Sequence, residues 1–313
     1  MCLDQSRDIL SQYYDLEFVD LEARFFKHLR YLKLPESLFY LLKLKREKDL
    51  WIRDFYSVLT LPFDRTKGKN IAVIFHIDFS QFPLLSRPFL ILLEKLFFYR
   101  GLKKVDAIIV ISKYWENYFR ERGYRNIYKV YWGPKISDFD ISYEEVRDFK
   151  KKYNLEDKPI VYLGNCQKAK GAVEGYDALK DLDVHLVTSG RKQANIPALN
   201  LNLERREFLT LLKASTIAIT MSKFKEGLCY TTQEAMLSGT PVIGSGKGGM
   251  RELLEGGRQI ICPDFNLLRE KVEYLLSHPD IREKIGKDAH EFAKQFTRER
   301  FETELLAVIK NVI

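Results

Sequence analysis

The second half of the sequence alternates short apolar runs with segments of helical periodicity. β-Branched runs such as "PIVYLG", "VHLVTSG" and "PVIGSG" are separated by amphipathic stretches such as "ERREFLTLLKAS". Glycine, proline and polar residues bound each run and favour turns there. Strands that alternate with helices in this way build a parallel sheet with helices on its faces. The alternation therefore predicts an α/β domain with a doubly wound parallel sheet over residues 141–296.

The first 140 residues show a similar pattern with fewer repeats. A helix with an apolar face and a basic end is predicted over residues 84–105. Buried strands are predicted over residues 49–55, 70–80 and 106–112. These segments predict a second Rossmann-like domain over residues 1–140. We expect the C-terminal helix, residues 297–313, to pack back on this N-terminal domain.

Length and composition narrow the class of protein. With 313 residues and 46% apolar content, the chain can bury two domain cores. Its four cysteines show neither CxxC spacing nor clustering, which predicts a reducing compartment without disulfides or a zinc site. No apolar run approaches the roughly 18 residues of a membrane span, and no signal peptide opens the sequence. These features predict a cytoplasmic protein, either free or peripheral to the inner face of the membrane.

The positive charge of the chain is concentrated in its N-terminal part. Residues 1–135 carry 24 Lys and Arg against 16 Asp and Glu, and 27 of the 41 aromatic residues, whereas the remainder has no net charge. Such a bias indicates an anionic partner, of which nucleic acid, an anionic membrane surface and an anionic acceptor are the candidates. We expect no nucleic acid. The helical spacing and basic tail of "ESLFYLLKLKREK" fit an interfacial helix, and equally a helix that packs on its own sheet.

Two carboxylates lie within a segment, residues 217–245, that predicts a strand, a loop and a helix. "IAITM" predicts the strand, "SKFKEG" the loop and "TTQEAML" the helix, so Glu226 lies in the loop and Glu234 in the opening turns of the helix. Backbone amides and the dipole at a helix start favour an anion there. Two acids beside an anion site suit a ligand that has both phosphates and hydroxyls, and a nucleotide-sugar has both.

A second candidate for phosphate binding is "GNCQKAKG", residues 164–171, which follows a predicted strand. Its glycines permit tight turns, and Lys168 and Lys170 supply positive charge at the start of a helix. The same residues also fit a solvated surface turn. His76 ends the 70–80 strand, at the edge where α/β sheets bind ligands, although an ordinary surface histidine remains the alternative.

In order and spacing, these pieces resemble the retaining glycosyltransferases of GT-B fold that carry a Glu-x7-Glu motif, glycosyltransferase family four or glycosyl transferases group 1. The matching stretches are "VDAIIVISKYW" with "KVYWGP", "IVYLGNCQKAKG", "REFLTLLKASTIAITMSKFKEGLCYTTQEAMLSGTPVIGSGKGGMREL" and "LLSHPDIREKIGKDAHEFAKQFTRERF". The resemblance covers roughly residues 70–310. It implies two Rossmann-like domains with parallel sheets that face a cleft, with the acceptor side in residues 1–140 and the donor side in residues 141–296.

The resemblance also implies a role for each matching position. Glu234 would bind the ribose hydroxyls of the nucleotide, because one carboxylate can accept two hydroxyl protons. Glu226 would orient hydroxyls of the transferred sugar, and His76 would reach the donor sugar and the acceptor. Lys170 would offset charge on the leaving diphosphate. Backbone amides that would face the diphosphate at the helix start are those of Gly227, Leu228, Cys229 and Tyr230.

The sequence departs from the family pattern at two site positions and at its start. Asn165 stands where the family has an arginine of the diphosphate clamp, for which Lys168 or Arg191 would substitute. Cys229 stands where the family has a glycine. Family chains open with an apolar strand and a glycine-rich loop, whereas this sequence opens with "MCLDQSRDIL". We therefore expect an abbreviated N-terminal domain, or a sequence that starts inside a longer chain.

The activity implied is transfer of a hexose from a UDP- or GDP-sugar, with retention at the anomeric carbon, to a glycan or lipid-linked acceptor. The transition state resembles an oxocarbenium ion, and cations or amides must stabilise the departing diphosphate. We expect no metal and no cofactor, because lysine and helix amides supply the positive charge. Two alternatives remain: an inactive GT-B protein that binds nucleotide-sugar or serves as a partner subunit, and a sugar-nucleotide epimerase.

Overall fold

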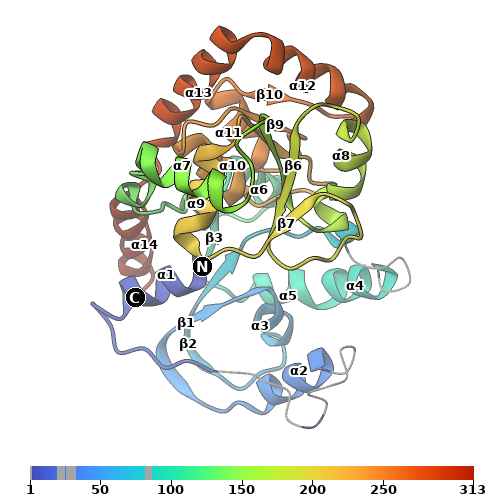
Figure 1. The fold of residues 1–313 in the computed structure, drawn as a ribbon. Coiled ribbons are helices and arrows are strands. Elements are labelled where there is room, and N and C mark those ends of the chain that lie inside the picture. Colours follow the sequence, from blue (N-terminus) through green and yellow to red (C-terminus); the bar gives the residue numbers. More distant parts are fainter. Residues whose placement is uncertain (1, 20–24, 26–32, 82–86) are drawn as a thin grey trace. The chain divides into compact units, whose positions relative to one another are not determined.

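The computed structural model describes residues 2–19, 25, 33–81 and 87–313, and the chain divides into two compact units (Figure 1). The N-terminal unit comprises Met1–Ile111, Glu116–Trp132 and Glu299–Ile313, and the C-terminal unit comprises Ser112–Trp115 and Gly133–Arg298. Apart from Ser112–Trp115, the C-terminal unit begins at Gly133, a few residues before the predicted domain boundary at position 140. The last helix of the chain returns to the N-terminal unit.

The N-terminal unit is built on a four-stranded parallel sheet of order β1-β2-β3-β4. Its strands are β1 (Glu47–Arg53), β2 (Lys67–Ile74), β3 (Ala107–Val110) and β4 (Ile127–Lys129). Each of the three predicted ranges contains part of a strand, β1, β2 or β3, but β1 is mostly exposed rather than buried and β2 ends at Ile74. Its helices are α1 (Cys2–Leu10), α2 (Lys33–Lys43), α3 (Phe55–Thr60), α4 (Arg87–Leu93), α5 (Tyr99–Leu102), α6 (Lys113–Arg120) and α14 (Arg298–Val312). A π-helical turn, Glu94–Phe98, joins α4 to α5, so the described part of the predicted 84–105 helix is helical with one irregular turn.

The two terminal helices pack together on this sheet. Phe301 and Leu305 of α14 and Ile9 of α1 form one buried cluster with Ile71 of β2 and Ile109 of β3. An apolar cavity of about 40 Å³ remains between the helices and the sheet, and Val73 and Val130 are among the residues that line it. Burial of these side chains is what attaches the end of the chain to its beginning.

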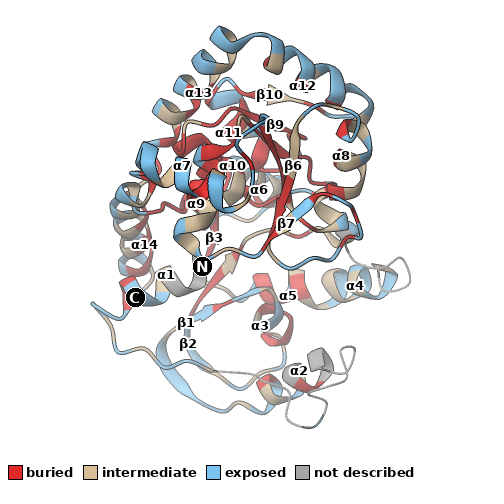
Figure 2. Cartoon of the chain, viewed as in Figure 1, coloured by how far each residue is buried: buried red, intermediate tan, exposed pale blue. Residues whose placement is uncertain are grey.

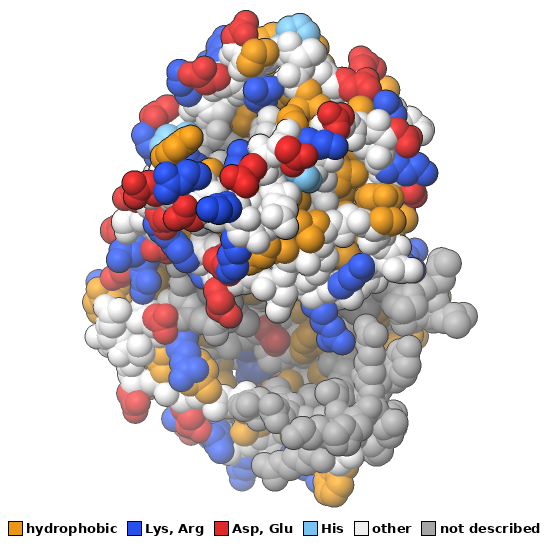
Figure 3. Space-filling model, in the orientation of Figure 1, with side chains coloured by type: hydrophobic (Ala, Val, Ile, Leu, Met, Phe, Trp, Pro, Cys, Tyr) orange, Lys and Arg blue, Asp and Glu red, His pale blue; other side chains and the backbone are white. Residues whose placement is uncertain are grey.

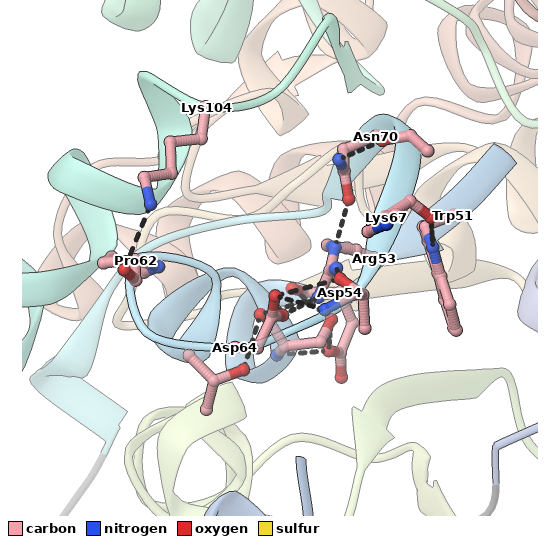
Figure 4. A network of polar contacts seen from close by, with 12 residues as sticks. Trp51, Arg53, Asp54, Pro62, Asp64, Lys67, Asn70 and Lys104 are labelled. Carbon is pink, nitrogen blue, oxygen red and sulfur yellow. Dashed lines mark hydrogen bonds and ion pairs between the residues drawn. The ribbon is translucent and has the colours of Figure 1, made fainter. Parts of the chain in front are cut away.

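A buried arginine ties β1 to β2 in the N-terminal unit (Figure 4). Arg53 is 3% exposed and forms an ion pair of 2.8 Å with Asp64, whose side chain is 2% exposed. Its Nε donates to Asn70 Oδ1 at 2.6 Å and its Nη2 donates to Thr66 Oγ1 at 2.5 Å. Burial lowers the pKa of Arg53, and the neighbouring Asp64 carboxylate opposes that effect. All three nitrogen atoms of the guanidinium therefore donate hydrogen bonds to protein groups.

The C-terminal unit is built on a six-stranded parallel sheet of order β10-β9-β8-β5-β6-β7. Its strands are β5 (Ile160–Asn165), β6 (His185–Ser189), β7 (Leu199–Leu201), β8 (Ile217–Thr220), β9 (Val242–Gly244) and β10 (Ile260–Ile261). Its helices are α7 (Tyr143–Lys152), α8 (Ala172–Leu179), α9 (Arg205–Ala214), α10 (Tyr230–Leu237), α11 (Met250–Gly256), α12 (Leu268–Ser277) and α13 (Pro279–Ala293). The predicted alternation is confirmed, and β7 is an edge strand that the sequence did not predict.

The sheet of the C-terminal unit lies inside a shell of helices. Its central strands are buried, whereas α12 and α13 expose one side to solvent (Figure 2). On the face drawn in Figure 3, side chains of both charge signs are intermixed over this unit. Within the ranges described above, no helix is long and apolar enough to cross a membrane.

Candidate functional site

The strand order of the C-terminal unit identifies the edge where a ligand fits. From β5 the chain proceeds outward through β6 and β7, and it then returns to place β8, β9 and β10 on the other side. The direction of winding therefore reverses between β5 and β8. In open α/β sheets, ligands bind beyond the carboxyl ends of the two strands at such a switch point. Here those ends lead into the two segments that carry Lys170 and Glu226.

The segment after β5 is held close to the segment after β8. A 3₁₀ turn, Lys168–Lys170, leads to Gly171, which caps α8 with φ of +78°. A Cβ at Gly171 would lie 2.4 Å from the carbonyl oxygen of Met221, so only glycine permits this approach. The backbone N–H of Lys223 also donates to the carbonyl of Ala169 at 2.9 Å. These contacts fix the position of Lys170.

Lys170 and Glu226 form a partly buried ion pair. Lys170 Nζ lies 2.5 Å from Glu226 Oε1, and the Ser222 hydroxyl donates to the same oxygen. The side chains of Lys170 and Glu226 are 27% and 7% exposed. Burial of Lys170 favours its neutral form, but attraction by the Glu226 carboxylate outweighs that effect and raises the lysine pKa. The lysine is therefore cationic at neutral pH.

The backbone around Glu226 is fixed by contacts from distant segments. The indole N–H of Trp115 donates to the Glu226 carbonyl at 2.9 Å, and the backbone N–H of Gly249 donates to it at 3.0 Å. A Cβ at Gly249 would lie 1.8 Å from the carbonyl oxygen of Gly227, so a side chain at Gly249 would displace the loop that carries Glu226. Trp115, which belongs to the C-terminal unit, and the turn after β9 thus support the candidate site.

The turn into α10 contains the four residues whose amides were predicted to face a diphosphate. Gly227, Leu228 and Cys229 precede the helix and Tyr230 begins it. Cys229 adopts φ of +73°, the left-handed conformation that glycine favours. Burial, with a contribution from the Glu226 charge, raises the pKa of the Cys229 thiol to about 11. The thiol is therefore protonated at neutral pH, and it accepts a hydrogen bond from Thr232 at 3.2 Å.

Glu234 is buried in α10 and pairs with an arginine that the sequence did not predict. The residue is 2% exposed, and Arg205 Nη1 donates to its Oε1. Burial raises the pKa of Glu234, and Arg205 opposes that rise. Arg205 is the first residue of α9, which follows β7. A charged residue that opens a helix after a strand is the one sequence signal that could have drawn attention to it.

The other predicted site residues lie as follows. Asn165 ends β5 and accepts hydrogen bonds of 3.4 Å from Tyr162 and Ser189. Lys168 is exposed in the 3₁₀ turn after β5. His76 is half-buried, two residues beyond β2, in the N-terminal unit. The structure therefore brings Lys170 and Glu226 into contact, places Glu234 at the same edge of the sheet, and assigns His76 to the other unit.

Among the described residues, no group of three or more His, Cys, Asp or Glu side chains is placed to hold a metal ion. The two carboxylates of the site are instead paired with the cations Lys170 and Arg205.

Comparison of the sequence with known proteins locates the same region. Residues 144–292 match the family described as "Glycosyl transferases group 1". Trehalose synthase of Pyrococcus horikoshii is 36% identical over 92 residues, which are 29% of this chain and 22% of that protein. An uncharacterized glycosyltransferase of Methanocaldococcus jannaschii is 27% identical over 65% of this chain and 59% of its own length. The chain thus matches about a fifth to three fifths of the lengths of these two relatives.

Solved structures resemble the whole fold at low sequence identity. Anabaena HepE in complex with UDP-glucose has a TM-score of 0.72 and 15% identity, with 98% of this chain and 88% of that chain covered. Sucrose-phosphate synthase from Thermosynechococcus elongatus has a TM-score of 0.71 and 18% identity, with 96% and 82% covered. The predicted α/β fold with two parallel sheets is confirmed as the GT-B type. Residues 144–292 are therefore similar to the glycosyl transferases group 1 family, and the fold of the chain is of the GT-B type.

Proposed function

We propose that the protein is a retaining glycosyltransferase that moves a sugar from a UDP- or GDP-sugar to a glycan or lipid-linked acceptor. The observation that carries the proposal is the arrangement of Lys170, Glu226 and Glu234 beyond the switch point of a GT-B sheet. This arrangement presents a cation, a helix start and two carboxylates to one ligand. The HepE structure, which contains UDP-glucose, supports a nucleotide-sugar as that ligand.

Each residue has a task that its chemistry suits. Lys170 and the first amides of α10 stabilise the diphosphate as it departs, a place where positive charge is most effective. Glu226 accepts hydrogen bonds from hydroxyls of the transferred sugar, whose transition state has oxocarbenium character. Glu234 binds the ribose. Because Lys170 and the amides provide the positive charge, we propose that the reaction needs no metal or cofactor.

Binding of the donor is tested by thermal unfolding with UDP and GDP in the absence of Mg²⁺. One of the two nucleotides is expected to raise the melting temperature, because a ligand that binds only the folded state stabilises it. Glu234→Ala should abolish the rise, whereas the control Glu270→Ala, in the exposed face of α12, should leave it unchanged. If neither nucleotide stabilises the protein, the assignment of the donor site is wrong.

Catalysis is tested by slow hydrolysis of a nucleotide-sugar that binds. Glu226→Ala and His76→Ala are each expected to reduce hydrolysis strongly. Equal hydrolysis by both variants and the parent protein would reject these catalytic assignments. Binding of a donor that is never hydrolysed or transferred would favour the alternative, a GT-B protein that binds nucleotide-sugar without turnover. Asn165 and Cys229, which depart from the family pattern, are the residues that favour this alternative.

For the acceptor side, we propose contact with the cytoplasmic face of an anionic membrane through α4 and the π-helical turn after it. No residue of α4 is buried, and Phe89, Leu92 and Leu96 are 58%, 51% and 39% exposed. Lys95 lies among them and is also exposed. Apolar side chains beside a cation are typical of helices that lie in a membrane interface.

Membrane contact is tested by sedimentation with vesicles that contain anionic lipid. Association is expected to weaken as salt rises, because salt screens the attraction between exposed charges. Phe89→Ser with Leu92→Ser should reduce association, whereas the control Tyr274→Ser removes an exposed aromatic from α12 and should not. The absence of association, or association that is independent of salt, would reject the membrane contact.

A further inference from the structure

The carboxylate of Glu234 uses one of its two oxygens within the protein. Oε1 accepts a hydrogen bond from Arg205, and Oε2 accepts none from any residue that the structure describes. The residue is only 2% exposed. An ionised carboxylate has about four acceptor positions, so Oε2 can still accept a hydrogen bond from a ligand. Glu234 is the fifth residue of α10, the helix that follows the turn of the candidate donor site.

Arg205 is itself held in one place. It opens α9, and its guanidinium lies 6.0 Å from the centre of the Phe139 ring, in the 3₁₀ turn before α7. Its side chain is 37% exposed, so the guanidinium reaches Glu234 from the solvent side. Its charge favours the ionised carboxylate, whereas burial of Glu234 favours the neutral one. A neutral carboxyl group is a weaker acceptor for a hydroxyl than a carboxylate is.

We propose that Arg205 is the positioning residue for ribose recognition: it holds Glu234 through Oε1 and leaves Oε2 to accept a ribose hydroxyl of the nucleotide. This inference rests on the proposed function, because it concerns the nucleotide of the donor. It also revises the expectation that both oxygens of Glu234 bind hydroxyls, since Oε1 is already occupied. Arg205 acts through Glu234 and need not touch the reacting atoms.

The test compares the affinities of UDP and 2′,3′-dideoxy-UDP by calorimetry, or of the guanosine pair if GDP is the nucleotide that binds. A hydrogen bond to a charged group contributes enough that the parent protein should prefer the ribonucleotide by about tenfold or more. Arg205→Met should reduce the ratio of the two affinities to about threefold or less, and Glu234→Gln is expected to do the same. Affinity for the dideoxynucleotide should change little, because it makes no contact that depends on Glu234.

The matched control is Arg206→Met, which removes the same charge from the next position. Arg206 pairs with Glu145 instead, so the preference should stay at the parent value. If the Arg205→Met variant does not fold, Arg205→Gln replaces it, because glutamine is polar and nearly as long. The preference for the ribonucleotide should fall in this variant too. Unchanged preference in the Arg205 variants, or equal weakening of both nucleotides, would overturn the inference. A parent protein that binds neither nucleotide would instead reject the donor site itself.

Discussion

The two units bury ion pairs in different ways. In the N-terminal unit, Arg53 and Asp64 are both almost fully buried, and Arg53 donates to three further groups of the protein. In the C-terminal unit, the cations of the two buried pairs remain partly exposed, at 27% for Lys170 and 37% for Arg205, while their carboxylates are buried. The first pair is complete without a ligand. The other two each have one partner that faces solvent.

This difference separates a structural ion pair from a candidate functional one. A buried pair whose hydrogen-bonding groups are all used by the protein contributes to folding specificity, and removal of one partner leaves an uncompensated charge. A pair that retains an exposed cation or an unused oxygen can exchange partners with a ligand. The comparison thus predicts that variants of the first pair affect stability, and that variants of the others affect binding or turnover.

The largest effect on stability is expected for Asp64→Ala. Loss of this carboxylate leaves Arg53 buried without its counter-ion, which costs about 3–5 kcal/mol in the free energy of unfolding. Urea unfolding measures the change. The control is Glu47→Ala at the start of β1, the strand that carries Arg53, because its pair with Lys67 is exposed and such pairs contribute at most about 1 kcal/mol. Equal losses in the two variants would show that the Arg53 network is not the closed pair that the comparison requires.

Lys170→Met is expected to affect turnover more than stability. Loss of one charged group that stabilises a departing anion reduces kcat by about 10²–10³-fold. Stability should fall by less than in Asp64→Ala, because Lys170 is partly exposed and Ser222 still donates to Glu226. The measurements are hydrolysis of the donor and urea unfolding, with the exposed Lys180→Met as control. A large loss of stability with unchanged turnover would place this pair in the structural class.

The contrast between the units also explains what could be predicted from the sequence. Alternating apolar runs predicted both parallel sheets, because periodicity is a local property of the chain. The glycines and lysines of 164–171 stand out for the same reason. The pairs Arg53 with Asp64 and Arg205 with Glu234 could not be predicted, since each joins segments that meet only in the folded chain. Strand β7 is three residues long, too short to show a period.

Cys229, which departs from the family pattern, has a strained backbone conformation in the structure. Its φ of +73° lies in the left-handed region that glycine favours. Cys229→Gly removes that strain, which is of the order of 1–2 kcal/mol, but adds backbone freedom to the unfolded chain, so stability should change by less than about 1 kcal/mol. Cys229→Val places a β-branched residue in the same conformation and should destabilise the protein by about 1–3 kcal/mol. Thermal unfolding of both variants tests this, and a tolerated valine would contradict the left-handed turn.

The smallest effect on the free energy of unfolding is expected for a substitution beside the cavity in the core of the N-terminal unit. Val73→Ile adds one methylene group beside the cavity of about 40 Å³, and each buried methylene contributes about 0.8 kcal/mol. The same change in the C-terminal unit, Val161→Ile, adds a methylene to a fully buried position in the core of that unit, where overpacking is destabilising. Urea unfolding should therefore show a small gain for the first variant and a loss for the second. A loss in both would mean that the cavity cannot accept the added group, and that the two cores are packed alike.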